Sequence, residues 1–202
     1  MLSLKINLKK YPPTSLKLIA GFLKKGSVLV LPTDTIYGFS CLANNAKAIQ
    51  KIKSLKKISK DKPLSILISN LEMLKKYVYL SNEQEKNLKK VWTKKTRPTT
   101  VILKNRHKLP LVLTGKSDGL AVRLPKLEFL TKIIKEVNCP LVSTSLNLSG
   151  QELISNPKDI IKYFPTRSNQ PDLVVDAGAC NRCRASKIID LREDSQAIIL
   201  RK

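Results

Sequence analysis

Two short polar clusters carry the side chains best suited to hold a small ligand. Residues 143–150 read Ser-Thr-Ser-Leu-Asn-Leu-Ser-Gly and directly follow the apolar residues 139–142. Residues 32–38 read Pro-Thr-Asp-Thr-Ile-Tyr-Gly and directly follow the apolar residues 28–31. Small hydroxyl and amide groups leave room for a ligand and supply both donors and acceptors. One such cluster would indicate a solvated turn, but two strand ends that open into polar residues indicate a pocket of an open α/β sheet.

Basic residues that could neutralise a bound anion lie between these clusters in the sequence. Lys56, Lys60 and Lys62 precede one apolar stretch, and Arg123 ends another. Lysine binds phosphate as a point charge, whereas the arginine fork suits a carboxylate bidentately. The usual role of such lysines is a solvated face, so their charge alone does not assign them to a site. The only histidine, His107, lies in a Lys-rich loop away from any plausible nucleophile, and we expect it at the surface.

The charge balance favours contact with polyanions. The chain has 38 Lys and Arg against 15 Asp and Glu, which gives a net charge of +23. Such a charge attracts RNA, nucleotides or pyrophosphate. The abundance of Lys, Ile, Asn and Leu is also typical of AT-rich coding sequence, so the charge has two readings. Aromatic residues are only 5% of the chain, which disfavours binding of single-stranded RNA by base stacking.

The sequence gives no sign of a membrane span, a signal peptide or a metal centre. Apolar runs stay below the ~18 residues that a transmembrane helix needs. Cysteines at positions 41, 139, 180 and 183 lack the spacing of a disulfide framework, which favours a cytoplasmic protein. Cys180 and Cys183 have C-x-x-C spacing, but no second pair or nearby histidine completes a zinc site.

Hydrophobic periodicity predicts the elements that position the clusters. We expect helices from Pro13-Thr14-Ser15 to Lys25, from Asn44 or Asn45 to Leu55, and over 71–79, 82–92, 128–137 and 157–163. We expect strands over 27–31, 63–68, 99–103, 120–124, 141–142, 173–176, 188–191 and 197–200. Helices and strands alternate early and strands gather late. This pattern predicts a single-domain α/β fold with a mixed, twisted sheet.

Taken together, the motifs resemble those of the YrdC family of threonylcarbamoyl-AMP synthases. The resemblance rests on Pro32–Gly38, Lys56–Leu64, Val122–Pro125 and Ser143–Gly150, which occur in the family's order. It implies one YrdC-like domain over residues 1–202, with an open twisted sheet flanked by helices around a large concave groove. It also implies the short form of the family, without the extra C-terminal domain of longer members.

The resemblance implies an enzyme, an L-threonylcarbamoyladenylate synthase of the nucleotidyltransferase class. Its substrates would be L-threonine, bicarbonate and ATP, with Mg²⁺ accompanying ATP, and its product would serve the t6A37 modification of tRNA. RNA or tRNA-modification proteins are the expected further partners. Such a reaction needs no enzyme nucleophile, because alignment of the reactants and stabilisation of phosphate charge can supply the catalysis. We therefore assign no catalytic residue.

The resemblance also implies roles for individual residues. For L-threonine, the matching positions are Thr35, Arg123 and Ser143. For ATP, the matching positions are Lys56, Lys62, Ser145, Asn147, Ser186 and Arg201. Tyr37 is expected in the pocket wall, and Asp176-Ala-Gly178 matches a D-x-G turn of the family.

Several departures from the family pattern leave a second reading open. Ile58 stands where the K-x-R motif has an arginine, which removes a phosphate contact unless Lys57 or Lys60 replaces it. Leu146 replaces an alanine and is expected to narrow the nearby space. The W-P-G-P-x-T motif becomes the longer, glycine-free segment 92–100, and Lys187 replaces a threonine.

The alternative is a divergent, non-catalytic RNA-binding paralogue that keeps the groove. The charge of +23 and Ile58 favour this alternative, while the intact first and last motifs favour the synthase. A related carbamoyl-transfer enzyme of hydrogenase maturation is a third reading. That enzyme usually sits in a much longer chain with acylphosphatase and zinc-finger segments, which this sequence lacks.

Overall fold

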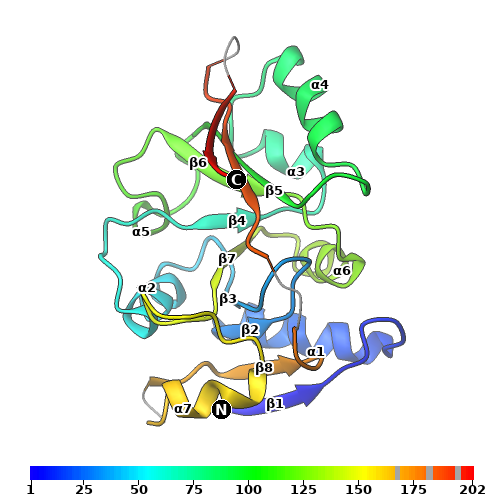
Figure 1. Ribbon diagram of the computed structural model, residues 1–202, viewed down its shortest axis with the longest axis vertical. Coiled ribbons are helices and arrows are strands. Elements are labelled where there is room, and N and C mark those ends of the chain that lie inside the picture. The colour runs from blue at the N-terminus through cyan, green and yellow to red at the C-terminus, as the bar shows by residue number, and fades with distance from the viewer. Residues whose placement is uncertain (167–168, 181–183, 194–196) are drawn as a thin grey trace.

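A mixed β-sheet runs through the whole protein and is flanked by helices (Figure 1). The computed structural model describes residues 1–166, 169–180, 184–193 and 197–202. Within these residues, ten strands form one sheet in the order β1-β8-β2-β3-β7-β4-β6-β5-β9-β10. The strands are β1 (Leu2–Lys5), β2 (Leu29–Leu31), β3 (Gly38–Ser40), β4 (Ser65–Leu67), β5 (Thr99–Lys104), β6 (Gly119–Arg123), β7 (Leu141–Ser145), β8 (Leu173–Asp176), β9 (Lys187–Asp190) and β10 (Ile198–Arg201). The predicted α/β fold with an open mixed sheet is confirmed.

Helices flank this sheet and bury apolar residues (Figure 1). They are α1 (Pro13–Lys24), α2 (Ala46–Lys56), α3 (Leu71–Lys75), α4 (Asn82–Val91), α5 (Leu111–Thr114), α6 (Glu128–Val137), the 3₁₀ helix η1 (Pro157–Asp159) and α7 (Ile160–Tyr163). α1 packs against α6, and α2 packs against α5. Tyr11 and Phe129 meet edge to face beside α6, with ring centroids 5.2 Å apart. None of the helices in the described residues is long and apolar enough to cross a bilayer.

The centre of the sheet is antiparallel and contains the start of the polar cluster at residues 143–150. β7 pairs antiparallel with β3 on one side and with β4 on the other. Ser145 lies opposite Gly38 of β3, and Ser143 lies opposite Ser65 of β4. The expectation that this cluster follows the strand is therefore wrong for Ser143–Ser145. Their backbone pairs with two neighbouring strands, while their small side chains leave space above the sheet.

The polar cluster at residues 32–38 lies in a connection between two strands, one of which the sequence did not predict. Residues 32–37 join the antiparallel strands β2 and β3, and β3 was not predicted because its Gly-Phe-Ser sequence is too short for a periodic signal. β1 was not predicted either, and it adds a parallel edge strand beside β8. α1 begins at Pro13, within the predicted start at Pro13-Thr14-Ser15, but none of these residues caps it through a side chain. Asn45 does cap α2, accepting a 3.0 Å hydrogen bond from Ala48 N–H.

A buried lysine fixes the basic loop after α2. Lys53 is only 2% exposed, and its Nζ donates to the backbone oxygens of Lys60 and Lys62, both at 2.6 Å. Burial lowers the pKa of Lys53, because removing its charge from water is costly. The two carbonyl contacts offset this cost. Gly115, which follows α5, supports the same loop from outside. At φ +60°, a Cβ on Gly115 would lie 2.4 Å from the Asp61 carbonyl oxygen.

Replacing Gly115 should therefore displace this loop. We expect Gly115→Ala to lower the free energy of unfolding by about 1–3 kcal/mol, because a strained backbone position gains a clash. Urea denaturation measures this change. Gly21→Ala in α1 is the matched control, since an added Cβ there meets nothing within 4 Å. It should instead raise stability by about 0.5–1 kcal/mol, and similar losses in both variants would contradict the role of Gly115.

Candidate functional site

One groove of about 500 Å³ is lined by all nine residues predicted to bind ligands. Their positions are Thr35, Lys56, Lys62, Arg123, Ser143, Ser145, Asn147, Ser186 and Arg201. They come from the β2–β3 connection, the end of α2 and the loop after it, strands β6, β7 and β10, the turn after β7 and the residue before β9. The volume lies within the ~300–1,000 Å³ of typical small-molecule sites. The predicted concave groove is present, although the ligand assignments of its residues remain predictions.

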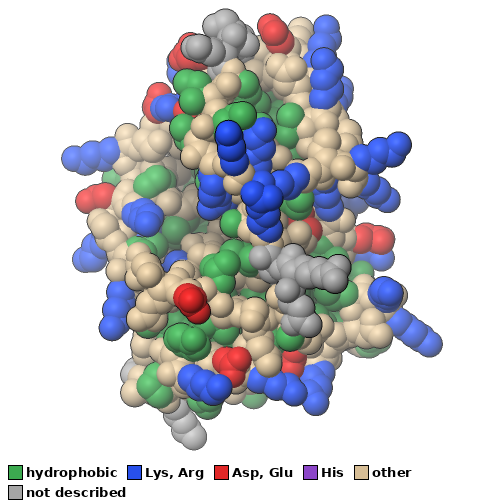
Figure 2. Space-filling model, in the orientation of Figure 1, with side chains coloured by type: hydrophobic (Ala, Val, Ile, Leu, Met, Phe, Trp, Pro, Cys, Tyr) green, Lys and Arg blue, Asp and Glu red, His purple; other side chains and the backbone are tan. Residues whose placement is uncertain are grey.

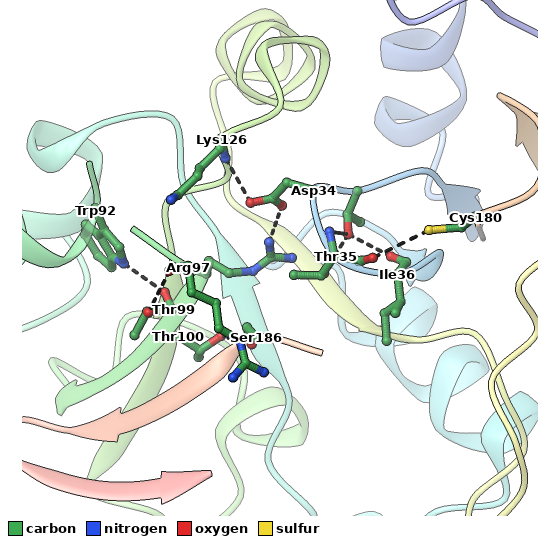
Figure 3. A network of polar contacts seen from close by, with 12 residues as sticks. Asp34, Thr35, Ile36, Trp92, Arg97, Thr99, Thr100, Lys126, Cys180 and Ser186 are labelled. Atoms are coloured by element: carbon green, nitrogen blue, oxygen red, sulfur yellow. Dashed lines mark hydrogen bonds and ion pairs between the residues drawn. The ribbon is translucent and has the colours of Figure 1, made fainter. Parts of the chain in front are cut away.

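A buried ion pair holds Arg123 at the groove. Its Nη1 donates to Asp34 Oδ1, and the two side chains are only 6% and 9% exposed. The other Asp34 oxygen accepts a 3.0 Å hydrogen bond from Lys126 N–H, so the carboxylate is held from two directions (Figure 3). Among the described residues, Arg123 Nε and Nη2 make no further hydrogen bond. These donors remain available for an incoming carboxylate.

Thr35 is arranged to accept a hydrogen bond from a ligand. The Thr33 hydroxyl donates to Ile36 O at 2.7 Å and accepts from Thr35 N–H at 3.0 Å. The two threonine hydroxyls lie 2.8 Å apart. Because the Thr33 proton is already engaged with Ile36 O, Thr35 is the donor in this contact. The lone pairs of the Thr35 hydroxyl are then suited to an amine or hydroxyl group of a ligand.

Lys56 organises the polar strip that follows β7. Its Nζ donates to Ser145 O at 2.5 Å, to Asn147 O at 2.9 Å and to Asn147 Oδ1 at 2.8 Å. Ser145 Oγ adds a 2.7 Å bond to Asn147 Oδ1. Lys56 was expected in the loop, but α2 continues through this residue and buries it to 4% exposure. The Lys56 ammonium therefore holds this polar strip of the groove in place and does not extend as a free side chain toward a ligand.

The remaining residues of this wall differ in their surroundings. Lys62 is exposed at the groove and is able to reach a ligand anion. Ile58 also lines the groove and packs against the core, whereas neither Lys57 nor Lys60 is among the lining residues. The expectation that Leu146 narrows the pocket is wrong. Leu146 is fully buried in the core, because its side chain points away from the groove-facing serines.

A hydroxyl pair and Arg201 line the β9–β10 end of the groove, and Arg97 lies next to it. Ser186 Oγ lies 2.8 Å from Thr100 Oγ1, and Arg201 donates to Ser186 O at 2.8 Å and to Ser186 Oγ at 3.1 Å. Arg97 Nη2 donates to the neighbouring Ala185 O at 2.8 Å. Lys and Arg side chains gather over β9 and β10 on the face shown in Figure 2. This end of the groove is therefore strongly positive.

Tyr37 anchors the first motif to the D-x-G turn. Its hydroxyl donates to Gly178 O at 2.8 Å and accepts from Ala177 N–H at 2.9 Å. The ring is buried in the groove wall, as expected, and burial raises its pKa. Cys180 Sγ lies 3.6 Å from Thr35 O, so the turn contacts the first motif twice. Cys183, the other half of the C-x-x-C pair, lies outside the described residues.

Sequence reasoning missed several residues that support the groove. Asp34 was read only as part of a motif, although it is the partner of Arg123. Lys53 and Lys126 had no visible signal, since one basic residue among many looks like a surface residue. Arg97 had a weak signal, because it lies in the longer, glycine-free segment 92–100 that departs from the family motif. His107 is exposed, as expected.

Comparison with known proteins gives the relationships of the chain. A family model for Sua5, YciO and YrdC, described as "Telomere recombination", matches residues 21–202. A threonylcarbamoyl-AMP synthase of Hydrogenovibrio crunogenus is 30% identical over 156 residues, which cover 76% of this chain and 83% of the relative. One from Pyrococcus abyssi is 29% identical over 179 residues, 88% of this chain and 51% of the relative.

Solved structures share the fold. Pyrococcus abyssi Sua5 complexed with L-threonine has a TM-score of 0.85 and 27% identity, covering 99% of this chain and 56% of that chain. The present chain thus spans little more than half the length of that protein. Escherichia coli YciO has a TM-score of 0.83 over 100% of this chain and 94% of its own, and its 22% identity supports the fold alone.

The buried Lys56 predicts proton uptake on nucleotide binding. Burial, and then the charge of Lys62, lower the pKa of Lys56 to about 8. A triphosphate nearby favours the charged ammonium and raises this pKa, so ATP affinity should fall as pH rises through about 8. At pH 8, binding should take up about half a proton. Calorimetry in buffers of different ionisation enthalpy measures this number.

The matched control for this measurement is Lys62→Gln, which removes a neighbouring charge without removing the buried amine. Uptake should persist in Lys62→Gln and disappear in Lys56→Gln. Uptake that survives in Lys56→Gln would assign the proton to another group.

Proposed function

Because this chain belongs to the Sua5/YciO/YrdC family, we propose that it is an L-threonylcarbamoyladenylate synthase, a nucleotidyltransferase. Relatives named threonylcarbamoyl-AMP synthase and a related structure complexed with L-threonine support the proposal. The observation that carries it is the composition of the groove. A partly engaged guanidinium and an acceptor hydroxyl lie in the same groove as lysines, arginines and serines suited to a polyphosphate.

L-threonine binds at the Arg123 end in this proposal. The substrate carboxylate accepts hydrogen bonds from the Arg123 donors that Asp34 does not use. Its amine lies against the Thr35 hydroxyl, which is an acceptor in the network described above. Ser143, whose backbone oxygen accepts a 2.7 Å bond from Ser65, lies on the floor of the groove between them. This arrangement leaves the amine directed at the centre of the groove.

ATP occupies the rest of the groove in this proposal. The strip held by Lys56 contributes Ser145 and Asn147, while Lys62, Ser186 and Arg201 contribute charge and hydroxyl groups. Mg²⁺ enters with ATP, bound to phosphate oxygens and water, as is usual for this ion. Ser and Thr hydroxyls fit such a solvated ion, since the Asp34 carboxylate is already engaged with Arg123 and Lys126.

The chemistry then needs alignment rather than a protein nucleophile. The neutral threonine amine forms a carbamate either by attacking the carbon of CO₂, with loss of a proton, or by attacking the carbon of bicarbonate, with loss of water. A carbamate oxygen attacks the α-phosphorus of ATP, and pyrophosphate leaves with the electrons of the broken P–O bond. Arg123 and Thr35 orient the amine, while the cations of the groove stabilise the leaving pyrophosphate.

The product would supply the t6A37 modification of tRNA in the cytoplasm, with RNA or tRNA-modification proteins as further partners. A non-catalytic RNA-binding paralogue is the alternative, and the net charge of +23 favours it. The two functions predict different products from the same incubation.

The synthase predicts a labelled adenylate from labelled L-threonine. The purified chain is incubated with ATP, Mg²⁺, bicarbonate and labelled L-threonine, and the products are separated by chromatography. We expect threonylcarbamoyl-AMP and an equal amount of pyrophosphate, both dependent on bicarbonate. Folded protein that makes no adenylate, yet binds RNA with an affinity that falls steeply with salt, would establish the alternative instead.

A further inference from the structure

Arg97 and Arg201 lie at the β9–β10 end of the groove, and Arg123 is near enough to influence Arg201. Arg123 and Arg201 line the groove directly, and Arg97 contacts Ala185, which also lines it. Partial burial, and then the charges of Arg97 and Arg123, lower the pKa of Arg201. These guanidinium groups are thus close enough to repel one another. Asp34 pairs with Arg123, so an additional anion would relieve the repulsion between Arg97 and Arg201.

Arg97 is directed to this cluster by the strand that follows it. The residue lies two positions before Thr99, the first residue of β5, which pairs in parallel with β9. Its Nη2 bond to Ala185 O places the guanidinium next to Ser186, as Figure 3 shows. Among the described residues, the Arg97 side chain donates one hydrogen bond, to Ala185 O. Most of its N–H donors therefore remain available.

The loop that carries Arg97 is held on both sides. Trp92 Nε1 donates to Thr99 O at 2.8 Å, and Thr96 Oγ1 donates to Val91 O at 2.5 Å. Lys126 Nζ contacts the loop at Thr96 Oγ1, at 3.3 Å. Because these contacts order the backbone before ligand arrives, Arg97 would bind an anion with little loss of conformational entropy.

The opposite wall of the groove offers fewer direct contacts to phosphate. Ile58 is apolar, and the Lys56 ammonium is engaged with Ser145 and Asn147. Lys62 is the exposed cation on that wall. A polyphosphate therefore finds its bidentate donors at the Arg97–Arg201 end, where Arg201 contacts the Ser186 hydroxyl and Arg97 contacts the neighbouring Ala185 O.

We propose that Arg97, together with Arg201, binds the β- and γ-phosphates of ATP and the pyrophosphate released from them. This inference rests on the proposed function and assigns a position for the leaving group within it. Arg97 lies in segment 92–100, which departs from the family motif. In this proposal it supplies a guanidinium to a groove that the apolar Ile58 lines on the other side.

Pyrophosphate binding tests the subsite without any need for catalysis. Calorimetry with magnesium pyrophosphate compares the wild type with Arg97→Gln, which removes the guanidinium and its charge. We expect the dissociation constant to rise about tenfold or more, because a charged hydrogen-bond donor is lost. AMP affinity should change less than about twofold, since AMP lacks the β- and γ-phosphates.

Lys95→Gln is the matched control, since it removes one positive charge from an exposed position of the same loop. It should weaken pyrophosphate less than about twofold, because solvent screens an exposed charge. Arg97→Lys keeps the charge without the fork and should show an intermediate loss. If Arg97→Gln fails to fold, this variant decides the question.

The outcomes separate this inference from the proposed function. Unchanged pyrophosphate affinity in Arg97→Gln and Arg97→Lys, or equal loss in Lys95→Gln, would overturn the subsite even if the wild type makes the adenylate. A wild type that binds pyrophosphate through Arg97 but makes no adenylate would retain the subsite and overturn the synthase.

Discussion

The buried ion pair between Asp34 and Arg123 is the contact on which the groove depends. Asp34 belongs to the connection between β2 and β3, while Arg123 ends β6 on the other side of the central strands β7 and β4. Removing one partner of such a pair typically costs about 3–5 kcal/mol, because the other charge stays buried and unpaired. The pair therefore fixes the distance across the groove and the orientation of the guanidinium that faces it.

Other parts of the groove are held by charges that are bound to backbone oxygens. Lys53 holds the loop after α2, and Lys56, one turn further along the same helix, holds the strip after β7. Lys126 links Asp34 to the loop that carries Arg97, through its backbone N–H and its side chain. Part of the high lysine content thus has a structural role. Composition alone attributes that lysine content to polyanion binding or to genome bias.

Sequence reasoning found the groove residues because motif types and spacing are local properties. Thr35, Ser143 and Arg123 were each assigned from short segments, and all three line the groove. It failed where tertiary contacts decide the outcome. The burial of Lys56 depends on carbonyl oxygens about ninety residues away in sequence, at 145 and 147. No periodicity in the sequence around Lys56 reports that distant partner.

The same limit explains the errors in the fold. β3 is three residues long and forms because β2 and β7 flank it, so its own sequence carries little signal. Leu146 lies between two groove-lining residues in the sequence, Ser145 and Asn147. Its own side chain is nevertheless fully buried in the core. Helix α6, whose pattern is strongly amphipathic, was predicted with correct bounds because burial of one face decides its position.

The most direct test of a threonine site at Arg123 is calorimetric titration of L-threonine into the wild type and Arg123→Lys. Lysine keeps a cation opposite Asp34, so the variant should retain the thermal midpoint of the wild type, but it lacks the fork that holds a carboxylate. We expect the wild type to bind one equivalent of L-threonine and the variant to bind about 1.5 kcal/mol more weakly. Equal affinity for L-threonine in the two folded proteins would contradict the carboxylate site.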